Sequence, residues 1–195
     1  MALFTEGQLR AVAKSRATRA HDSVTASLHK SVSKAASLSA FNIFLSHSYL
    51  DKELVLGMTE SLEKLGYTVY VDWREDTQLS RDKVTKGTAH VLRERIAQSE
   101  SLFFATTTSA KDSKWMPWEL GYMDGKKGKS AILPISQANS STDTYEGQEY
   151  LGIYPYVTAS NSTEGKERLW IHEDTDTYIV FDAWIIGKQP RKRSQ

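Results

Sequence analysis

The segment Trp115-Met116-Pro117-Trp118-Glu119 places one carboxylate among aromatic side chains, and Tyr122 follows it. A carboxylate beside indole rings suits a reaction that builds positive charge on its substrate. The carboxylate can stabilise that charge, and an indole face can stack on a cationic ring. The alternative is a solvated glutamate on a helix surface that interacts with the helix dipole. We favour a catalytic Glu119, because a carboxylate among aromatics in a predicted cleft is typical of functional sites.

Short apolar runs alternate with segments of helical periodicity over residues 41–135. Four of the runs are predicted to be strands, at residues 41–46, 68–72, 101–107 and 131–135. The segments between them are predicted to be helices, at residues 54–65, 84–96 and 115–123. Continuous apolar strands separated by helices favour a parallel sheet covered on both faces. Residues 150–157 are predicted to be a fifth, edge-like strand, and residues 178–186 a helix or a short hairpin.

Ligands of an open parallel α/β sheet bind outside the carboxyl ends of its strands. Three segments are predicted to meet there: residues 46–51, residues 72–76 and the loop that leads to Glu119. Asp51, in the first segment, is expected to cap the helix that follows it. The sequence has no G-x-G-x-x-G after the first strand and no G-x-x-x-x-G-K-[ST], which argues against a dehydrogenase and a P-loop ATPase.

Four motifs follow one another in this region. They are Phe44-Leu45-Ser46-His47-Ser48 with Asp51-Lys52 beyond it, the strand within residues 66–72, the strand within residues 99–107, and Trp115-x-x-x-Glu119-Leu120. In this order they resemble the first box, the strand entering the BB loop, the third strand and the Trp-x-x-x-Glu motif of Toll/interleukin receptor (TIR) domains. The resemblance spans residues 41–135. It implies an α/β, flavodoxin-like TIR fold, with a central parallel sheet of about five strands flanked by helices.

The resemblance also implies a reaction. TIR enzymes cleave the nicotinamide–ribose bond of NAD+, and the glutamate of their Trp-x-x-x-Glu motif is catalytic. The resemblance implies that Glu119 is the corresponding residue here. In these enzymes the aromatic residue four positions before the glutamate borders the nicotinamide pocket. Trp115 is at the corresponding position in this sequence. Departure of nicotinamide builds oxocarbenium character on the ribose, as in glycoside cleavage. One carboxylate is enough for this chemistry, because nicotinamide leaves without being protonated.

Further substrate contacts are implied beside the first two strands. In the family, the segment after the first strand lines the NAD+ site. The corresponding residues in this sequence are Ser46, Ser48 and Tyr49. Asp72 and Trp73, at the end of the second strand, are also expected to contact the substrate. Ser48 and Tyr49 stand where many relatives carry a basic residue. Arg74 or Arg81 could therefore supply the contact to the diphosphate.

The composition fits a globular protein in a reducing compartment. Hydrophobic residues make up 39% and charged residues 25% of the 195 residues. The absence of cysteine excludes disulfides, thiolate metal sites and a cysteine nucleophile, and the histidines show no metal-ligand spacing. We expect no metal and no resident cofactor, since NAD+ enters as the substrate. A formal net charge of +1 gives no reason to expect a nucleic acid, and no apolar run is long enough for a membrane span. A cytoplasmic location is expected.

Three parts are expected along the chain: an N-terminal helical extension at residues 1–39, a TIR-like α/β domain at residues 40–187, and a disordered basic tail at residues 188–195. The extension carries few apolar residues, so we expect it to pack on the main domain. Its apolar face is thin for a membrane-surface helix. An oligomerisation helix stays open as the alternative.

The leading hypothesis is a NAD+ glycohydrolase or cyclase that resembles the signal-producing TIR proteins of the Thoeris type of antiphage defence. Its product is ADP-ribose or a cyclic ADP-ribose-type messenger, which would activate a separate effector protein. Self-association into an oligomer or filament is expected. The first alternative is a non-catalytic TIR adaptor that acts by self-association. The second is an enzyme similar to nucleoside 2-deoxyribosyltransferases, which uses a glutamate on an N-glycosidic bond and needs no NAD+.

Overall fold

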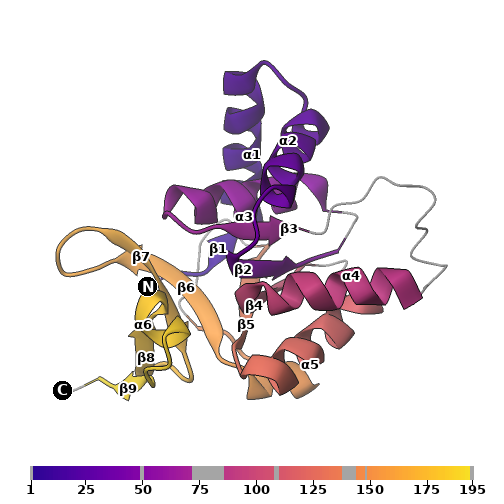
Figure 1. Ribbon diagram of the computed structural model, residues 1–195. Helices are drawn as coiled ribbons and strands as arrows, with labels where there is room; N and C mark the ends of the chain where they lie inside the picture. Colours follow the sequence, from indigo (N-terminus) through magenta and orange to yellow (C-terminus); the bar gives the residue numbers. More distant parts are fainter. Residues whose placement is uncertain are drawn as a thin grey trace.

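The structure, a computed structural model, describes residues 2–48, 51–71, 86–107, 110–137, 144–147 and 149–193. A central sheet lies between two groups of helices (Figure 1). Helices α1 (Glu6–Ala20), α2 (Val24–Ala36) and α3 (Lys52–Lys64) are on one side of it, and α4 (Lys86–Ala97) and α5 (Trp115–Lys127) on the other. The predicted sheet with helices on both faces is therefore confirmed.

Four parallel strands form the centre of the sheet. They are β2 (Phe41–Ser46), β3 (Val69–Val71), β4 (Ser99–Thr106) and β5 (Ser130–Ser136), in the spatial order β3-β2-β4-β5. The register places Ile43 opposite Val69 and Ser46 opposite Phe104. All four predicted central strands are present. They form because apolar, partly β-branched runs can be buried on both faces.

Alternate side chains of these strands point into two separate cores. Leu45 and Phe103 pack toward α3, together with Met58 and Leu62. The neighbouring residues of each strand face the opposite way, as Phe44 does, and join Leu92 of α4 and Leu120 of α5. The period of two along each strand thus supplies both cores from one set of strands.

The N-terminal segment contributes to both the sheet and the core. Strand β1 (Phe4–Thr5) pairs in parallel with the end of β5, and Ala2 forms a bridge with Ala159. Helix α1 starts at a capping box, in which the side chain of Thr5 accepts from the backbone of Gln8 and the side chain of Gln8 accepts from the backbone of Thr5. Leu9 of α1 is buried in the core on the α3 side of the sheet. The N-terminal helices therefore belong to the same packed unit as the parallel strands.

The sheet is larger than expected, with nine strands in the described part of the chain instead of about five. A 3₁₀ turn at Ala110–Asp112 precedes α5, and a second one at Glu149–Ile153 follows β5. After the second turn come β6 (Tyr156–Asn161), β7 (Glu167–His172), β8 (Thr177–Val180), α6 (Phe181–Ile185) and β9 (Arg191–Lys192). Strand β6 pairs in parallel with β5, and β7, β8 and β9 follow as antiparallel neighbours.

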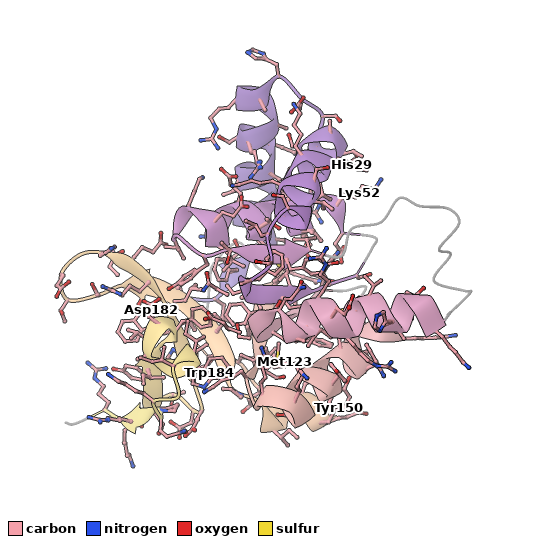
Figure 2. The ribbon with its side chains drawn as sticks, in the orientation of Figure 1. His29, Lys52, Met123, Tyr150, Asp182 and Trp184 are labelled. Carbon is pink, nitrogen blue, oxygen red and sulfur yellow. The ribbon has the colours of Figure 1, made fainter. Side chains whose placement is uncertain are left out.

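Three observations in this region differ from the expectations. The strand predicted at residues 150–157 starts only at Tyr156, and it is not an edge because β7 pairs along the outer side of β6. The apolar run at residues 178–186 is the end of a strand followed by a short helix. Arg191–Lys192, within the tail expected to be disordered, pairs with β8. Figure 2 shows the labelled Asp182 and Trp184 of α6 on the side of the molecule opposite His29 of α2.

Candidate active site

The strand order locates a topological switch point between β2 and β4. From β2 the chain adds β3 on one side of the sheet, and then crosses to add β4 on the other side. This is the flavodoxin-like order, in which ligands bind beyond the carboxyl ends of the two strands at the switch. Those ends are Ser46 of β2 and Thr106 of β4. Two of the segments predicted to bind the ligand start at these ends: residues 46–51 and the loop that leads to Glu119.

Glu119 lies on the buried face of α5. The residues that this helix buries are Met116, Glu119, Leu120 and Met123, at the spacing of one helical face. Only 4% of Glu119 is exposed, which excludes the alternative of a solvated surface glutamate. A carboxylate on an apolar face is costly unless donors satisfy it. Met123, labelled in Figure 2, marks this face one turn further along the helix.

Ser46 supplies such a donor. Its hydroxyl donates a hydrogen bond to Oε2 of Glu119 at 2.6 Å, across 73 residues of sequence. Only 1% of Ser46 is exposed. Hydrogen bonds from a hydroxyl to a carboxylate are short and stronger than neutral ones. The contact therefore joins the predicted catalytic residue to the end of β2, and brings together two of the residues expected at the site.

His47 and Ser48, which follow β2, are also buried. Nδ1 of His47 lies 2.9 Å from the carbonyl oxygen of Leu45. Because that oxygen can only accept, Nδ1 carries the proton and donates. The backbone carbonyl of Ser48 accepts from the backbone N–H of Asp51 at 3.4 Å. Hydrogen bonds therefore hold both His47 and Ser48 in place at the switch point.

Asp51 does not have the role expected for its side chain. It occupies the N-cap position of α3, and its carbonyl accepts from the N–H of Val55, but its carboxylate makes no capping hydrogen bond. Instead, Oδ2 of Asp51 accepts from the hydroxyl of Thr107 at 2.5 Å. Thr107 directly follows β4. The expectation of a side-chain cap is therefore wrong, because the carboxylate binds the connection after β4.

The aromatic side chains near Glu119 form a ladder along α5. Trp115 meets Trp118 edge-on at 5.4 Å, and Trp118 stacks on Tyr122 at 5.5 Å. The guanidinium of Arg93 lies over the ring of Trp118 at 5.9 Å. Both tryptophans are half-buried. Since Tyr122 and Arg93 also engage Trp118, the ring better placed to stack on a substrate is Trp115.

Three expected substrate contacts, Tyr49, Asp72 and Trp73, lie outside the described residues, as do Arg74 and Arg81. Within the described residues, no cluster of three or more histidine, aspartate or glutamate side chains could hold a metal ion. In the same part of the chain, no helix has the length and apolar character needed to cross a membrane.

Comparison with known proteins yields two relatives, whereas no family model matches the chain. The chain is 46% identical over 200 aligned residues to a protein of Bacillus cereus (strain MSX-D12) named probable 3' cyclic ADP-D-ribose synthase ThsB'. That alignment covers 95% of this chain and 98% of the relative. A Cytobacillus dafuensis protein named putative cyclic ADP-D-ribose synthase TIR2 is 35% identical over 83 residues, which are 42% of this chain and 22% of that protein.

Proposed function

This chain belongs to the Thoeris-type TIR family, and on that premise we propose that it cleaves NAD+ to nicotinamide and a cyclic ADP-ribose. The observation that carries the proposal is Glu119, buried at the switch point and hydrogen-bonded by Ser46. It belongs to the motif Trp115-x-x-x-Glu119, whose glutamate is catalytic in TIR enzymes. A buried carboxylate with this setting has no comparable use in a protein that acts only by self-association.

In the proposed reaction the bond between the ribose anomeric carbon and the nicotinamide nitrogen breaks. Its electron pair moves to that nitrogen, so nicotinamide leaves as a neutral molecule and the ribose gains oxocarbenium character. Glu119 faces this developing charge, and its attraction is strengthened because the site is shielded from water. Trp115 stacks on the cationic ring before it departs. No metal and no further cofactor takes part in this scheme.

Cyclisation and hydrolysis differ in the nucleophile that reaches the anomeric carbon. In cyclisation an atom of the same ADP-ribose attacks, and in hydrolysis a water molecule does. Two observations support cyclisation: both relatives are named as cyclic ADP-ribose synthases, and Glu119 is almost inaccessible to solvent. The names of the relatives also disfavour the adaptor and the nucleoside deoxyribosyltransferase-like enzyme. In this proposal the product acts on a separate effector protein in antiphage defence, and the enzyme self-associates and works in the cytoplasm.

Nicotinamide release from NAD+, followed by chromatography, tests the reaction. The variant Glu119→Gln keeps the size of the side chain but removes its charge, and is expected to lose at least about 100-fold in rate. Glu94→Gln is the matched control, because Glu94 is a well-exposed glutamate of α4. The assay is repeated over a range of protein concentrations and with a crowding agent, since self-association is part of the proposal.

Each outcome has a clear meaning. Absence of nicotinamide release by the wild type under all these conditions would overturn the enzymatic function. Equal release by the wild type and Glu119→Gln would overturn the role of Glu119. Mass spectrometry of the second product distinguishes the two reactions, because a cyclic product is lighter than ADP-ribose by one water. If only ADP-ribose forms, the enzyme is a hydrolase.

A further inference from the structure

We propose that Ser46 is a positioning residue, which acts by holding the carboxylate of Glu119 and not by binding the substrate itself. The inference rests on the proposed function of the same site. The family resemblance placed Ser46 among residues that line the substrate site. The geometry points to a different role, because its hydroxyl is already committed to Glu119 at 2.6 Å.

The position of Ser46 is fixed by the sheet. It is the last residue of β2, which pairs with β3 on one side and β4 on the other, and it stands in register with Phe104. With 1% of its surface exposed, Ser46 has little room to move. A hydroxyl on such a rigid strand end is a well-defined anchor for a longer and more mobile side chain.

Glu119 needs an anchor of this kind. A glutamate has three rotatable side-chain bonds, and its neighbours on the buried face of α5 are Met116, Leu120 and Met123, whose side chains have no hydrogen-bond donor. The hydrogen bond from Ser46 restricts Oε2, and thereby the direction of the whole carboxylate. Because a displacement of about 1 Å can cost about 100-fold in rate, this restriction bears directly on turnover.

The hydrogen bond also affects protonation. A donor aimed at a carboxylate favours its charged form, and loss of the donor in a buried site favours the neutral form. The reaction requires the charged form, because it has to stabilise a cation. Without Ser46 the enzyme is therefore expected to need a higher pH for full activity, an effect that a purely structural serine would not have.

The kinetic test compares Ser46→Ala with Ser101→Ala. Ser101 is a matched control: it is a fully buried serine of the adjacent strand β4, and its hydroxyl donates to the backbone oxygen of Asn42 at 2.8 Å. Ser46→Ala is expected to lower kcat by about 10- to 100-fold with KM changed less than about threefold. The acidic limb of its kcat–pH profile is expected to move upward by about one pH unit. Ser101→Ala is expected to change neither.

Ser46→Cys keeps the size of the side chain and a weak donor, and is expected to fall between the wild type and Ser46→Ala. In the Glu119→Gln background, Ser46→Ala is expected to cause little further loss, because the residue it positions is already altered. A rise in KM with kcat unchanged would instead show that Ser46 binds the substrate. An unshifted pH profile would also overturn the proposal.

Chemical unfolding supplies a readout that needs no activity. Unfolding of the wild type, Ser46→Ala, Glu119→Gln and the double variant forms a double-mutant cycle. Non-additive effects are expected if Ser46 holds Glu119, and additive effects would contradict that contact. A wild type that releases no nicotinamide refutes the proposed function, whereas an active wild type with a KM-only effect at position 46 refutes this inference alone.

Discussion

The backbone of Leu9 in α1 passes directly over Gly57 in α3. A Cβ atom at position 57 would lie 2.6 Å from the carbonyl carbon of Leu9, and closer still to its oxygen. Real Cβ atoms do not approach a backbone so closely, so only glycine permits this crossing. The N-terminal helices can therefore seat on α3 because of one residue in the middle of α3.

Gly57→Ala is expected to destabilise the protein by about 1–3 kcal/mol, because the added methyl group must push α1 away from α3. Urea denaturation at neutral pH measures this free energy of unfolding. Gly7→Ala is the control, since a Cβ atom at that exposed position of α1 meets nothing within 4 Å. It is expected to leave stability unchanged or slightly raised. Equal stability of Gly57→Ala and the wild type would show that α1 does not depend on this crossing.

The sequence predicted an N-terminal extension that packs on the main domain, but the close crossing could not be predicted from it. Helix α1 buries Leu9, Ala13 and Ala17. Two of these are alanines, which permit close approach but add little to an apolar pattern. Its strand β1 has two residues, too few for a periodic signal. Burial of these residues depends on Gly57 far along the chain, which no local pattern reveals.

The central strands and Glu119 were predictable because each has a distinct local pattern in the sequence. Strands β2, β4 and β5 are buried on both faces, and so appear as continuous apolar runs. Glu119 stood out because aromatic residues surround it in sequence. Strand β8 is half-buried throughout, and the two residues of β9 are exposed and basic, so neither has a distinct pattern. The sheet was consequently underestimated at this end.

The hydrogen bond between Thr107 and Asp51 was missed because it joins residues 56 positions apart. Its donor and acceptor meet only because β2 and β4 are neighbours in register. A polar residue directly after an apolar strand was the only local sign. The contact ties the connection after β2 to the connection that leads toward α5, and so both hydroxyl–carboxylate pairs of the site span the switch point.

Thr107→Val is expected to lower the free energy of unfolding by about 1.5–3 kcal/mol, because it leaves the carboxylate of Asp51 without this donor. Thr107→Ser retains the hydroxyl and is expected to stay within about 0.5 kcal/mol of the wild type. Urea denaturation of both variants gives the comparison. If the two variants lose the same stability, the methyl group and not the hydroxyl of Thr107 is what matters.

Trp115→Ala is expected to raise KM for NAD+ by about fivefold to thirtyfold, the loss of a cation–π contact of about 1–2 kcal/mol. Trp118→Ala is the comparison on the same helix. It removes the ring between Trp115 and Tyr122, and is expected to reduce stability more than Trp115→Ala does. Steady-state kinetics over a range of NAD+ concentrations measures both. A larger KM effect at Trp118 than at Trp115 would move the nicotinamide contact to Trp118.

Tyr67 is expected to make the free energy of unfolding decrease at alkaline pH. Burial raises its pKa, and so do the charge of Asp182 and the hydrogen bond to it at 3.0 Å, whereas the charge of Arg168 acts in the opposite direction. In the unfolded chain a tyrosine has its usual pKa of about 10. Stability from a raised pKa is fully present below that pH and is lost as the pH rises toward the pKa of the folded state. The wild type is therefore expected to lose stability above about pH 10.

Tyr67→Phe cannot ionise at this position, so its free energy of unfolding is expected to fall less steeply than that of the wild type between about pH 9 and pH 11. Burial also raises the pKa of Tyr145 and Tyr154, so some dependence on pH is retained in the variant. Groups common to both proteins cancel when the two curves are subtracted. Parallel curves for the wild type and Tyr67→Phe would show that Tyr67 ionises alike in the folded and unfolded states.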